Sequence, residues 1–175
     1  MRVAWRCLPD SLLSPGHTDL DDDGTLDIYA NMGGWVPGDA FSSALFINPG
    51  NQHSWIIVTL RAVIGHLVSA TAIGARVELT AVDAEGHVQA IHRVVSSGGS
   101  YGGNSLRLEV GLGLAVAVRR LRVRWPSGRI QDYDTPPIRA SLQIVEGGTS
   151  WSLLPLRGFR VQSERGSGSC GCADN

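Results

Sequence analysis

Beyond residue 54 the apolar positions of this chain fall into short runs, and most of them alternate with polar positions. The segment 55–61, WIIVTLR, is a nearly continuous apolar run, which suits a buried strand. The segment 75–82, ARVELTAV, alternates with a period of two, as in a strand with one buried face. No segment in this region shows a sustained period of 3.6 residues with helix caps. The pattern therefore predicts an all-β chain.

Several strands follow one another at regular spacing. The segments 75–82 and 88–95 flank the turn DAEGH, with Gly86 at its tip, and predict a β-hairpin. In the segment 118–125, Leu121, Val123 and Trp125 face one side of a strand and the intervening arginines face the other. The remaining predicted strands are 28–30, 106–113, 129–134 and 141–147, and 96–105 is predicted as a glycine loop. Short, regularly spaced strands favour a mainly antiparallel β-sandwich or a barrel.

Composition agrees with a globular chain, because 43% of residues are hydrophobic and 18% are charged. No apolar run is long enough to span a bilayer. The three cysteines indicate little: Cys170 and Cys172 form a C-x-C in a Gly/Ser-rich tail, with no further ligand beside them for a zinc site. The charge, however, is unevenly placed. The stretch 19–27, DLDDDGTLD, holds five carboxylates and no base.

The spacing of this acidic stretch, D-x-D-x-D-G-x-x-D, points to a calcium ion. Calcium takes six to eight oxygen ligands at about 2.3–2.6 Å, and carboxylates at alternate positions of a tight loop can converge on one point. Gly24 lets the chain reverse there. The predicted ligands are the side chains of Asp19, Asp21, Asp23 and Asp27 and the backbone carbonyl of Thr25. An Arg-rich strand face within 118–125 is a second candidate to balance the charge.

The acidic stretch also allows two other interpretations. An EF-hand requires a Glu at the twelfth loop position and helices on both sides, but Ala30 stands at that position and a strand-like segment follows Asp27. A solvated acidic turn is the simpler alternative, since Asp and Gly favour turns. A β-hairpin calcium site fits the spacing better than either. Asp22 lies out of phase with the ligand positions and is expected to face solvent.

The segment 18–34, TDLDDDGTLDIYANMGG, resembles the calcium-binding FG-GAP/VCBS repeat, whose copies form the blades of integrin-like β-propellers. The pattern of the ASPIC/UnbV domain follows it in order: NPGNQHSWIIVTL, AIGARVELT, RVVSSGGSYGGNSLRLEVGLG, VRRLRVRWPSGRIQ and IVEG. That domain follows such repeats in cartilage acidic protein and its bacterial relatives. The resemblance covers about residues 17 to 147. One departure is Ser69, Ala70 and Thr71, where the family usually has Ser-Asn-Arg.

This resemblance implies a division of the chain. Residues 1–16 are unassigned, 17–50 are an FG-GAP/VCBS-like remnant, and 51–147 are the ASPIC/UnbV-like β domain. Beyond the resemblance, residues 148–161 are expected to form a terminal strand or extension, and 162–175, rich in Ser and Gly, a flexible tail. A propeller needs about four to eight blades, so we expect the C-terminal part of a longer repeat protein. By resemblance it is extracellular or at the cell surface, although the first residues do not read as a signal peptide.

Three other functional classes were considered. The five His residues are scattered, and no G-x-S-x-G or H-E-x-x-H motif occurs, which argues against a hydrolase. The arginines of 118–125 could form a basic stripe, but Trp125 falls on the opposite face, so no stacking platform for nucleic acid adjoins it. A carbohydrate-binding module is the main alternative, because Trp35 sits in a Gly/Pro-rich loop near the acidic stretch.

We therefore expect a non-enzymatic, calcium-stabilised extracellular recognition or adhesion module. Its partner is a protein or a glycan at a surface, together with upstream propeller blades where these are present. Neither nucleic-acid binding nor membrane insertion is expected.

Overall fold

A computed structural model describes residues 12–32, 44–65, 67–68, 71–99, 102–103 and 105–156 of this chain. Trp35, Cys170, Cys172 and the predicted tail 162–175 lie outside the described residues. The described part is all-β and contains no helix, as the hydrophobic pattern predicts. No helix of the length and apolar character required to cross a bilayer occurs in it.

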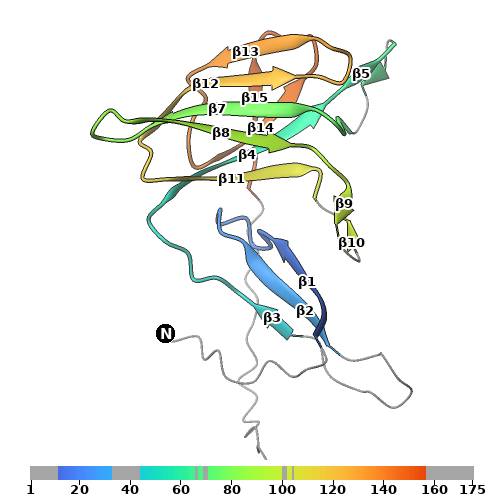
Figure 1. Ribbon diagram of the computed structural model, residues 1–175, viewed down its shortest axis with the longest axis vertical. Coiled ribbons are helices and arrows are strands. Elements are labelled where there is room, and N and C mark those ends of the chain that lie inside the picture. Colours follow the sequence, from blue (N-terminus) through green and yellow to red (C-terminus); the bar gives the residue numbers. More distant parts are fainter. Residues whose placement is uncertain are drawn as a thin grey trace, which may run out of the picture.

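Two four-stranded sheets pack face to face as a sandwich (Figure 1). One sheet has the order β11-β4-β14-β15 and the other β13-β12-β7-β8. The strands of the first sheet are β4 (Ser54–Arg61), β11 (Arg107–Gly113), β14 (Ala140–Val145) and β15 (Trp151–Leu154). Those of the second sheet are β7 (Arg76–Val82), β8 (Val88–Val94), β12 (Ala117–Arg124) and β13 (Ile130–Asp134). The predicted hairpin is confirmed, since β7 and β8 pair antiparallel with Leu79 opposite Ile91.

The core of the sandwich lies between these sheets and follows the predicted alternation. On β12, Leu121 and Val123 are fully buried, and Trp125 just beyond the strand is 2% exposed. The β4 strand is central in its sheet: it pairs with β11 on one side and runs parallel to β14 on the other. Ile56 and Val58 belong to the core, and Ile57, on the opposite strand face, is also buried.

Two small hairpins extend from the sandwich. One is β5 (Val63–Ile64) with β6 (Leu67–Val68), and the other is β9 (Gly98–Gly99) with β10 (Gly102–Gly103). The second hairpin lies in the segment 96–105, which was predicted as a glycine loop and in fact contains these two short strands.

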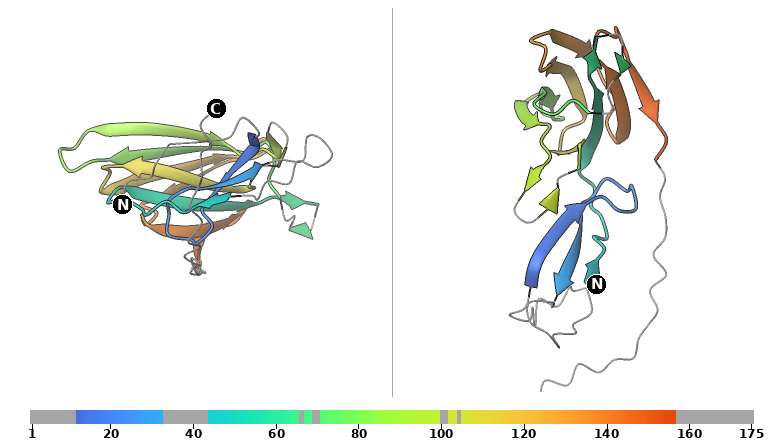
Figure 2. Two further views of the ribbon diagram at one scale, coloured as in Figure 1. Left: turned by 90° about the horizontal axis from the view of Figure 1, so that it is seen from below. Right: turned by 90° about the vertical axis from the view of Figure 1, so that its right-hand side faces the viewer.

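A third sheet, the N-terminal sheet, lies below the sandwich in Figure 1 and in the right-hand view of Figure 2. It consists of β1 (Leu12–Thr18), β2 (Asp27–Met32) and β3 (Ala44–Phe46), all antiparallel. Thr18 pairs with Asp27, so the stretch 19–27, hereafter the acidic loop, is the connection of the β1–β2 hairpin. Its tip points toward the sandwich (Figure 1). Strands on both sides of the loop agree with a β-hairpin site rather than an EF-hand.

Candidate metal centre

Three of the predicted ligands meet in the acidic loop. One carboxylate oxygen from each of Asp19, Asp21 and Asp27 lies within 4.8 Å of the others. Asp19 and Asp27 are buried, and Asp21 is half-buried. The turn between β1 and β2 therefore gathers negative charge in a place that water reaches poorly.

Backbone N–H groups hold two of these carboxylates in place. Asp19 accepts hydrogen bonds from the N–H of Asp23 at Oδ1 and of Gly24 at Oδ2, both at 3.0 Å. Asp27 accepts from the N–H of Leu20 at Oδ2 (2.9 Å) and of Asn48 at Oδ1 (2.8 Å). Each carboxylate oxygen has further lone-pair capacity. The two side chains are thus oriented while they remain able to bind a cation.

Asp21 differs from its neighbours. Its Oδ1 atom is buried and has no hydrogen-bond partner among the described residues. Burial, followed by the nearby charges of Asp23 and Asp27, raises the pKa of Asp21 above its ordinary value. Burial also raises the pKa of Asp19 to about 6, against the lowering effect of the N–H groups of Gly24 and Asp23. An unpaired buried carboxylate oxygen is costly unless a donor or a cation meets it.

Asp23 is placed differently from the other predicted ligands. Its Oδ1 accepts hydrogen bonds from the backbone N–H (2.8 Å) and the hydroxyl (2.6 Å) of Thr25. Asp23 is exposed and does not belong to the group of three oxygens that lie within 4.8 Å. The Asp23–Thr25 contact shapes the second half of the loop and uses only one oxygen of the Asp23 carboxylate.

The expectation that Asp22 faces solvent was wrong. Its side chain is 17% exposed, and its Oδ1 lies 2.6 Å from Nη1 of Arg107 on β11. Asp22 has a φ of 55°, in the left-handed region, which takes its side chain out of the alternating pattern of the loop. Arg107 also donates from Nη2 to the carbonyl of Asp19 and pairs with Glu109, both at 2.9 Å.

The arginine stripe of β12 does not balance the acidic loop, so the second candidate was also wrong. Arg120 pairs with Glu78 on β7 at 3.0 Å, and Arg122 forms two hydrogen bonds with Asp132 on β13. Asp132 lies directly opposite Arg122 on the neighbouring strand, whereas Glu78 lies opposite Arg122 and diagonally from Arg120. Sequence reasoning missed Arg107, although the alternating segment 106–113 contains it next to Glu109 on the same strand face.

Trp55 joins the acidic loop to the sandwich. A Cβ atom added to Gly24 would lie 1.9 Å from Cε2 of Trp55, so the indole packs directly against the glycine backbone. Gly24 also has a φ of 91°, which side chains rarely adopt. Position 24 therefore requires glycine for its backbone conformation and for this close approach. A cleft of about 270 Å³ opens beside the contact, between the acidic loop and strands β4 and β11.

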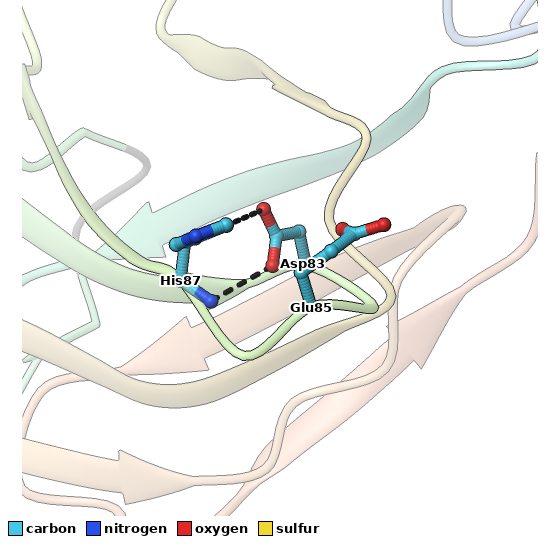
Figure 3. A group of neighbouring side chains, drawn as sticks. All are labelled: Asp83, Glu85 and His87. Atoms are coloured by element: carbon cyan, nitrogen blue, oxygen red, sulfur yellow. Dashed lines mark hydrogen bonds and ion pairs between the residues drawn. The ribbon is translucent and has the colours of Figure 1, made fainter.

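A second group of potential ligands occurs at the β7–β8 turn (Figure 3). Nδ1 of His87 lies 2.9 Å from Oδ2 of Asp83, and Asp83 Oδ1 accepts from the His87 N–H at 2.8 Å. These hydrogen bonds lower the pKa of Asp83. Figure 3 shows Asp83 between His87 and Glu85. The His87 side chain is 80% exposed, and the internal hydrogen bonds account for this turn without a metal.

Two motifs singled out in the sequence meet on the far side of the sandwich. Ser127, in WPSG, donates its hydroxyl to Oε1 of the buried Glu146, in IVEG. Oε2 of Glu146 accepts from the N–H of Val63 at 2.9 Å. The carboxylate therefore ties the β12–β13 turn to the start of β5, which gives these two motifs a structural role.

Comparison with known families finds a match over residues 66–150 to the family described as ASPIC and UnbV. This domain is a recognised non-catalytic module that often follows FG-GAP repeats. The match covers most of the sandwich, and it begins after the acidic loop and the N-terminal sheet in the sequence. No curated protein matches the chain.

Proposed function

We propose that this chain, which carries an ASPIC and UnbV match over residues 66–150, is a non-enzymatic recognition or adhesion module stabilised by calcium. The observation that carries the proposal is the buried, unpartnered Oδ1 of Asp21. It lies beside two carboxylates, Asp19 and Asp27, that backbone N–H groups already orient.

Electrostatics supports a cation at this point. Two unit charges about 4 Å apart repel by about 4 kcal/mol at an effective dielectric constant of 20. Three carboxylates whose oxygens lie within 4.8 Å of one another repel in this way unless protons or a cation offset their charge. All donors are oxygens, which suits a hard cation, and a mainly protein ligand set suits calcium better than magnesium. In this proposal Asp19, Asp21 and Asp27 hold the ion, and Asp23 and the Thr25 carbonyl complete the ligand set.

Calcium would act on more than the loop itself. The acidic loop contacts the sandwich through Arg107 and through the packing of Gly24 on Trp55. It also contacts the segment before β4 through the hydrogen bond from Asn48 to Asp27. An ion that fixes the loop would therefore fix the N-terminal sheet against the sandwich. A rigid arrangement of the two parts favours recognition, because less conformational entropy is lost on binding.

The proposed setting is extracellular. Calcium sites of extracellular modules bind with a Kd of about 10⁻⁴–10⁻³ M, and we propose an affinity in this range. We also propose that residues 17–50 are an FG-GAP/VCBS-like repeat that packs against upstream blades. Tyr29, Leu45 and Phe46 support this, since these three large apolar side chains of the N-terminal sheet are exposed. The partner is a protein or a glycan at a surface.

Calorimetric titration with calcium tests the proposal on the wild type, Asp21→Asn and Asp83→Asn. The wild type and Asp83→Asn are expected to bind with equal affinity, and Asp21→Asn at least about tenfold more weakly. Asp21→Asn should also raise the stability of the calcium-free protein, because it removes an unpaired buried charge. Absence of binding by the wild type, or equal affinity of wild type and Asp21→Asn, would contradict the proposal.

A further inference from the structure

The cleft beside the Trp55–Gly24 contact has the features of a small binding site. It measures about 270 Å³, just below the ~300–1,000 Å³ of pockets for drug-sized ligands. The acidic loop forms one wall through Asp19, Gly24 and Thr25, and strands β4 and β11 form the other through Trp55 and Glu109. The cleft therefore suits a ligand of about one ring.

Several polar groups at the cleft remain available to a ligand. Nε1 of Trp55 lies beside Gly24, where an added Cβ would be 2.1 Å away, and its N–H makes no hydrogen bond within the described part of the chain. Glu109 uses Oε1 for two hydrogen bonds from Arg107, and its Oε2 accepts none from the described residues. Asn51 uses its Oδ1 to accept from the N–H of His53, which leaves its amide N–H₂ as a donor. Donors and an acceptor thus surround a partly exposed aromatic ring.

The charge around the cleft disfavours an anionic ligand. Asp19 and Glu109 both line it, and Arg107 divides its one positive charge between Asp22 and Glu109. Asp19 is buried, and its carboxylate accepts hydrogen bonds from the backbone of its own loop. A polar site around an indole fits a molecule with an apolar face and a rim of hydroxyl groups. An aromatic ring with a polar N–H edge complements such a molecule.

We propose that this cleft binds one neutral pyranose unit of a glycan, with its C–H face on the exposed part of Trp55 and its hydroxyls bonded to Glu109 and Asn51. This inference rests on the proposed function, because it names the ligand class that the recognition module takes. It replaces Trp35, which lies outside the described residues, with Trp55 as the aromatic contact. Because the acidic loop forms one wall, calcium and the sugar must affect each other's affinity equally.

The test is saturation-transfer NMR with the methyl glycosides of glucose, galactose, mannose and N-acetylglucosamine, on the full chain in calcium. At least one glycoside is expected to receive saturation from the protein, and chelation of calcium should weaken its binding. Asn51→Ala is expected to weaken binding by about tenfold, because it removes a hydrogen bond to the ligand. Trp55→Phe is also expected to weaken binding, because the smaller ring offers less surface to the sugar. His92→Ala, at an exposed position of β8, is the matched control and should bind as the wild type does.

Three outcomes would overturn the proposal: no glycoside is bound, Asn51→Ala and Trp55→Phe bind as the wild type does, or methylammonium binds in place of the sugars. The melting temperature of each variant checks folding, and Asn51→Ala carries the test if Trp55→Phe does not fold. Calcium calorimetry on the same sample separates the two proposals. Calcium binding without glycoside binding would overturn the sugar site alone. Glycoside binding of equal affinity with and without calcium would overturn the proposed coupling between the two ligands.

Discussion

The sandwich and the N-terminal sheet differ in the kind of side chain that each of them buries. The sandwich encloses a continuous apolar core in which Leu79, Leu121 and Ile144 are fully buried. In the described part of the N-terminal sheet and its acidic loop, Ala30 is the one buried apolar residue, and the other buried side chains there are Asp19 and Asp27.

This difference shows how one chain can combine two sources of order. Burial of apolar area stabilises the sandwich and requires no ion. The N-terminal sheet depends on a polar loop that contacts the sandwich through Arg107 and Trp55. Changes in the sandwich core should therefore act independently of calcium, and changes around the loop should depend on it.

The largest expected effect is that of Leu121→Ala in the sandwich core. Removal of a fully buried leucine side chain leaves a cavity and should lower the free energy of unfolding by about 4 kcal/mol. Urea denaturation with and without calcium measures the change. The loss should be equal in both conditions, and recovery of stability by calcium would contradict the separation of the two regions.

Gly24→Ala should lower the free energy of unfolding by about 3 kcal/mol. The new Cβ would clash with the Trp55 ring, and alanine would also have to adopt a left-handed backbone conformation. Gly86→Ala is the matched control: its φ is 88°, but a Cβ there meets nothing within 4 Å. This control should cost only about 1 kcal/mol. Denaturant unfolding of both variants isolates the contact with Trp55, and equal losses would show that Trp55 does not hold the loop.

Arg107→Met should lower the free energy of unfolding by about 2 kcal/mol, because it removes hydrogen bonds to partly buried charged groups. Arg122→Met, which breaks an exposed ion pair with Asp132, should lower the free energy of unfolding clearly less than Arg107→Met does. The same unfolding measurement serves for both variants. A larger loss in Arg122→Met would mean that Arg107 does not join the two regions.

The smallest expected effect is that of pH on the calcium-free and calcium-bound forms. Since burial raises the pKa of Asp19 from 3.8 to about 6, the protonated carboxyl stabilises the calcium-free fold below that range. This contribution is lost as the pH rises through about 6. Calcium requires the ionised carboxylate, so the rise in Tm on adding calcium should be larger at about pH 7.5 than at about pH 5. An equal rise at both pH values would exclude Asp19 as a ligand.

The hydrophobic pattern predicted the sandwich well because burial sets the pattern directly. The alternation of Leu121, Val123 and Trp125 and the apolar run of β4 both correspond to buried positions. The strand β1 was not predicted, since its sequence LLSPGHT contains Pro and Gly and shows no regular alternation. The strand forms by pairing with β2, and this pairing has no signal in the local sequence.

The candidate site was predictable only in part. The spacing D-x-D-x-D-G-x-x-D predicted Asp19, Asp21, Asp23 and Asp27 as ligands, and the structure brings carboxylate oxygens of three of them together, those of Asp19, Asp21 and Asp27. It could not show that Asp23 hydrogen-bonds Thr25 or that Asp22 turns toward Arg107, 85 residues away in the sequence. A positive φ and a partner on a distant strand determine these side chains, and neither leaves a periodic signal.

Hydrogen exchange by mass spectrometry, with and without calcium, tests the central claim most directly. In the proposed function, a cation orders the acidic loop and so fixes the N-terminal sheet on the sandwich. Calcium should therefore slow exchange in peptides covering the acidic loop and Asn48, and leave peptides of β7 and β12 unchanged. Identical exchange of the acidic loop in both conditions would contradict the account.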